Sequence, residues 1–187
     1  MKVDIFNTDK KYNVIYADPP WHFGSKEIQK YKGERFRPLD TVYNTVKTEE
    51  MCLWDIKRIT EKDCAIFMWV TDAHMKEGLK LMEAWGFKYI TVAFVWEKLT
   101  SNGKRVVNLG AWTMKNCELC LLGTKGAMLK YKKANNIQQL VCAERQAHSK
   151  KPDEVRQRIK ALFGDIPCIE LFARQQADGW DCWGNEV

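Results

Sequence analysis

Six short apolar runs recur along the chain and predict buried β-strands. They are rich in β-branched and aromatic residues, as buried strands are. They cover residues 12–17, 64–70, 87–96, 118–123, 139–143 and 168–172. Each run is expected to form one strand.

Three segments between these runs carry apolar residues at helical spacing. The first begins at residues 48–50, the second is capped by Asp72 and ends at Gly86, and the third begins at residues 152–154 and ends before Gly164. The expected apolar faces are Met51, Leu53, Trp54 and Ile56 in the first, Met75, Leu79, Met82 and Trp85 in the second, and Val155, Ile159 and Leu162 in the third.

The alternation of strands and helices predicts an α/β domain with a mostly parallel sheet flanked by helices. In such sheets ligands bind beyond the carboxyl ends of the strands, so residues that follow strands are the candidates for chemistry. Two polar segments, residues 22–43 and 98–109, break the alternation and are expected to be long functional or mobile loops. The length fits a single domain, residues 1–187.

Composition adds a modest electrostatic signal. Thirty lysines and arginines against 24 aspartates and glutamates give a formal net charge of +6. Such an excess favours a polyanionic partner, but it also suits an ordinary soluble protein. Charge alone therefore leaves nucleic acid open as a partner without establishing it.

The cysteines and the short apolar runs indicate a cytoplasmic protein. The seven cysteines are an odd number and lie mostly within apolar runs, which is typical of reduced thiols in the cytosol. The apolar runs are far shorter than the roughly 18 residues that a membrane span requires. No contact with a membrane is expected.

Two further patterns are interpreted as core rather than as sites. Cys117 and Cys120 have the spacing of half a zinc site, but no second pair accompanies them and they lie in an apolar run, so we expect no metal. His74 and several tryptophans fall at helix or strand spacing, where packing is the simpler explanation.

The tetrapeptide Asp18-Pro19-Pro20-Trp21 carries the strongest chemical signal, because it directly follows the first predicted strand. The prolines have no N–H and fix φ, which leaves their carbonyls free to accept hydrogen bonds. Trp21 offers an aromatic plane on which a base could stack. A plain turn followed by a core tryptophan is the alternative explanation.

This set of groups suits a flat ring that carries an amine, such as adenine. Asp18 and the Pro19 carbonyl could both accept hydrogen bonds from the amine and stabilise the positive charge that develops on its nitrogen as it attacks a methyl group. A sulfonium donor would make the transfer a single in-line displacement. In a duplex the base must first leave the stack.

These residues resemble a family of adenine methyltransferases, typified by the catalytic subunit of the eukaryotic messenger-RNA adenosine methyltransferase and including small prokaryotic and phage members. The likeness spans nearly the whole chain, and its blocks follow the family's order. The blocks are residues 18–21 (DPPW), 67–71 (FMWVT), 85–87 (WGF), 116–121 (NCELCL), 148–154 (HSKKPDE), 169–174 (IELFAR), 179–181 (GWD) and 184–185 (GN).

The resemblance implies a Rossmann-like class I S-adenosylmethionine-dependent methyltransferase fold in permuted order, with the catalytic strand early and the cofactor strand late. Lys151 is similar to the family lysine that meets the donor's carboxylate, although a lone lysine there could also be a solvated charge. Glu170, near the end of an apolar strand, suits ribose hydroxyls. The expected S-adenosylmethionine residues are Asp18, Ser149, Lys151, Glu170, Leu171, Phe172, Arg174, Asn185 and Glu186, with Asp4 and Ile5 as a further pair.

The resemblance also implies a nucleic-acid site. Tyr43, Asn116 and Glu118 match positions around the adenine pocket, and ordinary packing or surface charge is the alternative explanation. Residues 98–109 correspond to a family loop at a subunit interface. The resemblance therefore allows a homodimer, or a heterodimer with a related subunit, that forms through this loop. Basic loop residues that would meet phosphates, or only solvent, include Lys26, Arg35 and Arg37.

Three functions stay open at this point. DNA is the preferred substrate, because a compact chain of this type resembles prokaryotic or phage adenine methylases. RNA is the alternative polymer, since no separate target-recognition domain is evident. A catalytically silent subunit that only binds nucleic acid is the third, although residues 18–21, Lys151, Glu170 and Asn185 are all intact.

Overall fold

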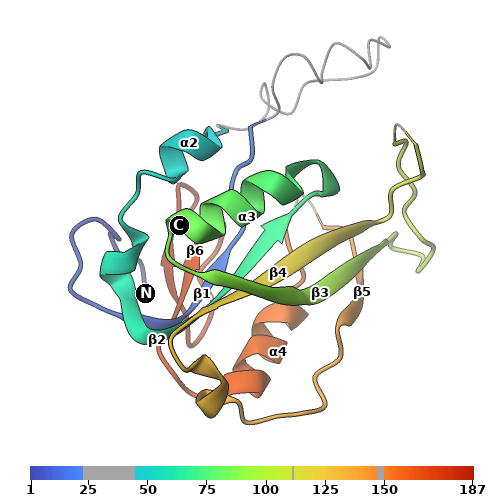
Figure 1. The fold of residues 1–187 in the computed structure, drawn as a ribbon. Helices are drawn as coiled ribbons and strands as arrows, with labels where there is room; N and C mark the ends of the chain where they lie inside the picture. Colours follow the sequence, from blue (N-terminus) through green and yellow to red (C-terminus); the bar gives the residue numbers. More distant parts are fainter. Residues whose placement is uncertain (23–44, 111, 147–149) are drawn as a thin grey trace.

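The computed structural model describes residues 1–22, 45–110, 112–146 and 150–187. Within this part, seven strands form one sheet in the order β5-β3-β4-β2-β1-β6-β7, with α3 and α4 on opposite faces (Figure 1). The strands are β1 (Tyr12–Ala17), β2 (Thr60–Val70), β3 (Lys88–Leu99), β4 (Cys117–Lys125), β5 (Leu140–Glu144), β6 (Cys168–Leu171) and β7 (Asp181–Trp183).

All six predicted strands are confirmed, within a few residues at their ends. The seventh strand, β7, was missed, because it is only three residues long and includes a charged residue. It pairs in parallel with β6, and Lys2 at the amino end of the chain bridges in parallel to Cys182. A strand this short forms because an existing sheet edge offers it partners.

The sheet is mixed but mostly parallel, as predicted. β4 runs antiparallel to both β2 and β3, whereas the pairings β1·β2, β1·β6, β6·β7 and β3·β5 are parallel. The carboxyl ends of β1, β2, β3 and β6 therefore meet at one edge, together with the amino end of β4. This edge is where the chemistry predicted from the sequence should lie.

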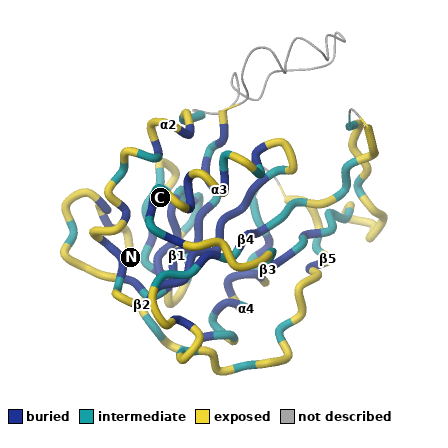
Figure 2. The backbone as a smooth tube through the Cα atoms, viewed as in Figure 1, coloured by how far each residue is buried: buried dark blue, intermediate teal, exposed yellow. Residues whose placement is uncertain are grey.

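Two apolar cores pack on the two faces of the sheet. Along β1, Ile15 and Ala17 belong to the core beneath α3, while Val14 and Tyr16 belong to the core beneath α4. β1 and β2, at the centre of the sheet, are buried along most of their length, and most exposed residues lie at the periphery (Figure 2). Burial on both faces explains why these strands read as continuous apolar runs in the sequence.

The first predicted helix was too long. α2 (Thr48–Met51) is a single turn, Leu53 is exposed, and Ile56 belongs to a separate 3-10 helix, Ile56–Ile59. The Met51 carbonyl accepts the indole N–H of Trp85 at 2.9 Å. This tertiary bond at the last residue of α2 accompanies a turn of the chain toward β2, which helical spacing alone does not reveal.

The second helix is confirmed with Met82 and Trp85 buried as predicted, but its cap and the position of Leu79 differ from the prediction. α3 (Met75–Ala84) follows a 3-10 helix, Asp72–His74, and Leu79 is exposed. Asp72 forms an ion pair with Lys115 at 2.8 Å and does not cap the helix. A Cβ on Gly78 would lie 2.4 Å from Val70 Cγ1. The helix therefore approaches β2 through Gly78, which turns Leu79 outward.

The third helix, α4 (Asp153–Phe163), is confirmed, with Val155 and Ile159 buried and Gly164 at φ +76° after its end. Leu162 is only partly buried, and Arg156 is buried instead. All seven cysteines are free thiols. Cys120 is core as expected, but Cys117 is exposed, so the interpretation of the pair as core was wrong for Cys117. No helix in the described part is long and apolar enough to span a bilayer.

Candidate active site

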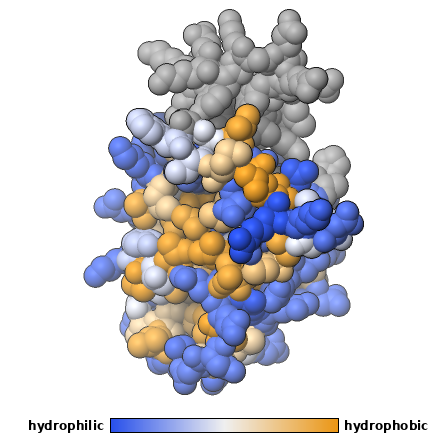
Figure 3. All heavy atoms as spheres, turned by 90° about the vertical axis from the view of Figure 1, so that its right-hand side faces the viewer, coloured by the Kyte–Doolittle hydropathy of each residue, from blue (hydrophilic) through white to orange (hydrophobic). Residues whose placement is uncertain are grey.

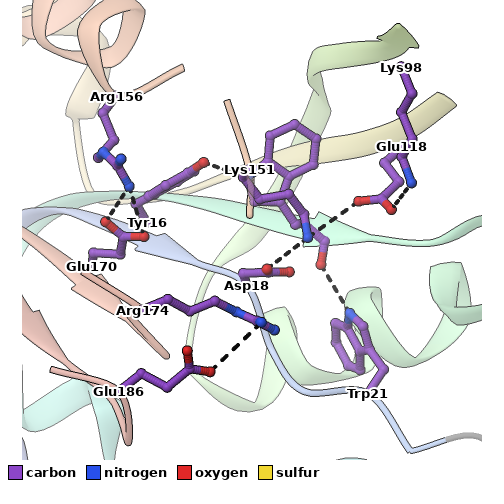
Figure 4. Close-up of polar contacts among 11 residues, drawn as sticks. Tyr16, Asp18, Trp21, Lys98, Glu118, Lys151, Arg156, Glu170, Arg174 and Glu186 are labelled. Carbon is purple, nitrogen blue, oxygen red and sulfur yellow. Dashed lines mark hydrogen bonds and ion pairs between the residues drawn. The ribbon is translucent and has the colours of Figure 1, made fainter. Parts of the chain in front are cut away.

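Four side chains of alternating charge line the carboxyl edge of the sheet (Figure 4). Asp18 follows β1 and accepts a hydrogen bond from the Lys151 ammonium at 2.7 Å. Lys151, just before α4, also lies 3.3 Å from Glu118 at the start of β4, and Glu118 pairs with Lys98 near the end of β3. Each of these side chains is at least four-fifths buried. Four segments of the chain thus contribute to one charge network.

The network sets the protonation of its members. Burial raises the pKa of Asp18, and the Lys151 ammonium opposes that rise, as does the guanidinium of Arg174. Burial disfavours the charge of Lys151, but Asp18 and Glu118 hold the pKa of Lys151 above its usual value. Burial likewise opposes ionisation of Glu118, yet Lys151 and Lys98 hold the pKa of Glu118 below its usual range. Lys151 and Glu118 are therefore firmly charged, whereas the charge on Asp18 depends on Lys151.

The backbone of the tetrapeptide is more engaged than the sequence predicted. The Pro19 carbonyl accepts the N–H of Trp21 and the Pro20 carbonyl accepts the N–H of Val46, both at 2.9 Å. The expectation that both carbonyls are free was therefore wrong. A carbonyl oxygen has two lone pairs, so the Pro19 carbonyl still has one for an incoming amine.

Trp21 is held rigidly and has limited surface to offer a base. Its indole N–H donates to the Trp69 carbonyl at 3.1 Å, and only 6% of the residue is exposed. The His74 ring stacks on it, with centroids 5.6 Å apart and planes 15° from parallel. One face of Trp21 is thus covered by His74, so a base could use only the remaining part.

His74 belongs to this site, and the sequence analysis missed that. It is buried as expected, but its ring hydrogen-bonds to the Thr71 hydroxyl at 2.8 Å, and its Nε2–H donates to the His22 carbonyl at 3.3 Å. His74 thereby touches both the ring of Trp21 and the backbone of the next residue. Its position just after β2, at the carboxyl edge, is the signal that could have identified it.

A second group of predicted residues lies after β6. Phe172 has φ +61°, the one non-glycine residue of the described part in the left-handed region, which bends the chain sharply where the strand ends. The Ala173 N–H then donates to the Trp183 carbonyl at 2.9 Å. A Cβ on Gly184 would lie 2.2 Å from the Ala173 carbonyl oxygen. The two segments touch backbone to backbone, which only glycine permits at position 184.

The polar members of this second group lie at the rim of the site. Arg174 pairs with Glu186 at 3.8 Å, and Figure 4 shows its guanidinium beside Asp18. Asn185 is exposed next to Glu186. Leu171 is fully buried in the core beneath α3 and so supports the site from below. The structure therefore brings both predicted groups to the same edge.

Glu170, which we expected to face ribose hydroxyls, pairs with another side chain of the protein. Both of its carboxylate oxygens accept hydrogen bonds from Arg156 Nη1 of α4, at 3.1 and 2.8 Å. Burial raises the pKa of Glu170 and Arg156 opposes that rise. Arg156 also pairs with Asp153, the first residue of α4. The carboxylate thus ties β6 to the start of the helix that follows Lys151.

An aromatic cluster adjoins Phe172. Trp54 lies between Phe6, Phe172 and Trp183, with ring centroids 5.8, 5.7 and 5.5 Å away. Asp4 and Ile5 were predicted to contact the cofactor. Ile5 is buried in the core, whereas Asp4 is exposed and its carboxylate accepts a hydrogen bond from the Phe6 N–H at 3.0 Å. Sequence spacing alone gave no sign that Phe6 and Trp54 join this edge.

The remaining predicted residues are placed as follows. Asn116 is partly exposed beside Glu118, and its carbonyl accepts the Lys98 N–H at 3.0 Å. Five predicted residues lie outside the described part of the chain, namely Lys26, Arg35, Arg37, Tyr43 and Ser149. In the described part, no cluster of histidine, cysteine and acidic side chains has the geometry of a metal site.

An open cavity of about 580 Å³ lies away from this chemistry. It is lined by Lys10, Tyr12, Lys160 and Trp180 among others, at the amino ends of β1 and β6. Asp18 is at the opposite end of β1. Cavity size therefore does not identify the site, whereas the convergence of charged side chains does.

Comparison with known proteins identifies the family of the chain. Residues 12–186 match the MT-A70 family. The chain is 40% identical over 189 residues to a type II methyltransferase, M.MunI, of a Mycoplasma species, covering 95% of this chain and 78% of the relative.

Eukaryotic relatives are more distant. The catalytic subunit of the human N(6)-adenosine-methyltransferase is 28% identical over 182 residues, covering 95% of this chain and 28% of its own length. An MT-A70-like N(6)-adenosine-methyltransferase of Arabidopsis thaliana is 28% identical over 191 residues, covering 100% of this chain and 25% of the relative. The chain thus spans about a quarter of the length of these larger relatives.

Proposed function

The chain belongs to the MT-A70 family, and on this premise we propose that it transfers a methyl group from S-adenosylmethionine to the 6-amino group of adenine in DNA. The observation that carries the proposal is the buried Asp18–Lys151 pair at the carboxyl end of β1, beside Trp21. It places a carboxylate of controlled charge where an amine can be held. Residues 1–187 act here as a single methyltransferase domain.

Asp18 and Pro19 are proposed to hold the amine. The Asp18 carboxylate accepts one amine hydrogen and the free lone pair of the Pro19 carbonyl accepts the other. Two aligned acceptors stabilise the positive charge that develops on the nitrogen as it attacks. Pro20 fixes the backbone turn, and Trp21, kept in place by His74 and Trp69, orients the adenine ring.

Lys151, Glu118 and Lys98 are proposed to keep Asp18 in its working state. The Lys151 ammonium favours ionised Asp18 in a buried place where a lone carboxylate would bind a proton. Glu118 holds Lys151 from the other side, and Lys98 holds Glu118. The chain of charges thereby gives the amine a negatively charged acceptor at neutral pH.

The residues at this edge fit S-adenosylmethionine. An aromatic cluster at Phe172 can pack on a purine ring, Lys151 is a cation for a carboxylate, and Arg174, Asn185 and Glu186 offer donors and acceptors for hydroxyl groups. Asp4 and Ile5, which precede Phe6 of this cluster, are proposed as a further pair of donor contacts. When bound, the donor supplies an electrophilic methyl group on a positively charged sulfur. That Ser149 contacts the donor stays a prediction. That Glu170 contacts the ribose also stays a prediction, since the observed partner of Glu170 is Arg156.

The strand order supports a class I methyltransferase fold in permuted order. The proposed catalytic strand, β1, comes early in the chain, and the proposed cofactor strand, β6, comes late, yet the two are hydrogen-bonded neighbours. Tyr16 pairs with Glu170 and Ala17 with Leu171. The two halves of the reaction can therefore meet although 152 positions separate Asp18 from Glu170 in the sequence.

DNA is the preferred polymer because the relative at 40% identity is a type II methyltransferase, while the adenosine methyltransferases match at 28–29%. Free thiols also suit the cytoplasm of a bacterial or phage-infected cell. RNA is the second candidate, because the more distant relatives are adenosine methyltransferases and adenosine is a ribonucleoside.

A methylation assay decides between these polymers. The same sequence is offered as duplex DNA, single-stranded DNA and RNA, and incorporated methyl groups are counted. We expect DNA to be methylated faster, and sequencing of methylated adenines in DNA from expressing cells then gives the recognition site. Equal rates on RNA would overturn the choice of DNA. Absence of S-adenosylmethionine binding in calorimetry would instead favour a catalytically silent subunit.

A further inference from the structure

A hairpin between β3 and β4, residues 100–116, projects from the carboxyl edge of the sheet and is described except at residue 111 (Figure 1, yellow-green). Its arms are held together by backbone bonds. Asn108 and Lys115 exchange two hydrogen bonds of 2.8 Å, and the Val106 N–H donates to the Lys98 carbonyl at 2.8 Å. The tip therefore has a defined support.

The tip presents large apolar side chains to solvent. Trp112 is 98% exposed and Leu109 is 84% exposed, and Met114 is also exposed. Figure 3 shows the side of the molecule from which the hairpin projects in Figure 1, and there apolar and hydrophilic residues lie next to one another on the surface. Large apolar residues gathered at one exposed place mark a site of interaction.

The charge of the same segment indicates which partner it meets. Residues 98–116 contain four basic residues and no acidic residue. Three of the basic residues lie on the hairpin, namely Lys104, Arg105 and Lys115. Arg105 and Lys115 pair with Glu97 and Asp72 outside it, at 2.6 and 2.8 Å. Both cations are exposed to solvent, and exposed cations can exchange such pairs for phosphate contacts.

The base of the hairpin is part of the active-site charge network. Lys98 precedes the hairpin, Glu118 follows it, and the two are paired. Lys115 is three residues from Glu118, which is at most about 10 Å of extended chain. This corresponds to about three base steps of a duplex. A nucleic acid whose adenine reaches Asp18 would therefore lie against the hairpin.

We propose that the hairpin tip, through Leu109, Trp112 and Met114, inserts into the duplex beside the target adenine while Lys104, Arg105 and Lys115 contact the backbone phosphates. The proposal rests on the proposed function. An adenine in a duplex must leave the stack before its amine can reach Asp18, and this costs unstacking energy. Apolar side chains inserted between base steps offset that cost, and an aromatic ring can stack on an exposed base.

The test compares matched variants. Leu109→Ala with Trp112→Ala removes the insertion, and Leu129→Ala is the control, because Leu129 is 79% exposed on the 3-10 helix Met128–Tyr131, near the amino end of β2 and away from the carboxyl edge. Methylation is measured on intact plasmid DNA and on the same DNA denatured to single strands. We expect the double variant to lose on the order of tenfold in rate on the duplex while keeping its rate on single strands. The affinity of the double variant for S-adenosylmethionine should change less than twofold, and so should the methylation rates of the control variant.

Three results would overturn the insertion. The first is an unchanged duplex rate, and the second is an equal loss on duplex and single strands. The third is sedimentation showing that the wild type is a dimer and the double variant a monomer, since residues 98–109 would then hold a second subunit as the family resemblance allows. If the wild type methylates no nucleic acid, the proposed function fails separately. Insertion is then judged by the affinity for a fluorescent duplex with a one-base gap, and equal affinities of the variant and the wild type overturn it.

Discussion

The ammonium of Lys151 lies 2.7 Å from a carboxylate oxygen of Asp18, although the two residues are 133 positions apart in the sequence. Asp18 ends the first strand and Lys151 precedes the last long helix, and both side chains are largely buried. The pair joins the segment proposed to hold the amine to the segment proposed to hold the methyl donor. Its consequences can be measured one residue at a time.

Removal of the charge on Asp18 should stop methyl transfer. We expect Asp18→Asn to lower kcat by about 10²- to 10³-fold, because an amide is a weaker acceptor for an amine that becomes positively charged. S-adenosylmethionine binding, followed by calorimetry, should stay measurable. The control is Asp9→Asn, since the Asp9 side chain is fully exposed. Turnover near that of the wild type would contradict the assignment of Asp18.

The pH dependence of activity should report on Lys151. Burial raises the pKa of Asp18 and Lys151 opposes the rise, so Lys151→Met should raise this pKa further. Ionised Asp18 is the proposed active form, so the acid limb of the profile of kcat against pH should move to higher pH, and raising the pH should restore part of the lost rate. The measurement is made at saturating S-adenosylmethionine. An acid limb that stays in place or moves to lower pH would rule out this role.

Loss of the Glu118 charge should weaken the fold as well as the site. Glu118→Gln leaves two largely buried lysines with one carboxylate fewer, and we expect the free energy of unfolding to fall by about 3 kcal/mol. The pKa of Glu118 is lowered in the folded protein, so this stabilisation is present above its unfolded pKa and is lost as pH falls through the lowered one. Urea unfolding at pH 7 measures it.

The exposed pair of Glu49 with Lys80 provides the control for that measurement. Glu49→Gln should leave the unfolding free energy nearly unchanged, because exposed ion pairs contribute little. Equal losses for Glu118→Gln and Glu49→Gln would show that the buried network does not stabilise the fold.

His74 should act by positioning Trp21. We expect His74→Ala to lower kcat by about tenfold, an effect comparable to the loss of one aromatic stack, with S-adenosylmethionine affinity unchanged. His74→Phe keeps the stacked ring but loses the hydrogen bonds to Thr71 and to the His22 carbonyl, so it should recover part of the rate. If both variants melt early and lose activity in proportion, His74 is only structural.

The close approach at Gly184 should be needed for the donor side of the site. Gly184→Ala places a Cβ 2.2 Å from the Ala173 carbonyl oxygen, and we expect it to destabilise the fold by about 2 kcal/mol and to raise KM for S-adenosylmethionine. Gly103→Ala is the comparison, because Gly103 faces open space and only its φ of +72° is unfavourable. An unchanged KM in Gly184→Ala would contradict the placement of this contact at the donor side.

The sequence by itself determined the strands and the chemistry at the end of the first one. Buried strands need apolar side chains on both faces, so six of the strands appear in the sequence as continuous apolar runs. Asp18-Pro19-Pro20-Trp21 is equally visible, because it directly follows the first of these runs. Lys151 and Phe172 could be singled out only through resemblance to the family. Nothing in the local pattern pointed to the pairings Lys151–Asp18 or Arg156–Glu170.

The tertiary structure alone decided which side chains meet. Helical spacing predicted Leu79 on the buried face, but the close contact with Val70 places Gly78 in the interior instead. His74 became a support for Trp21, and Glu170 turned to Arg156, because β1, β2 and β6 lie side by side with helices over their faces. Local pattern indicates which segments form buried strands. The partner of a buried charge depends on which distant segment closes over it, because a charge in a low-dielectric interior is stable only beside an opposite one.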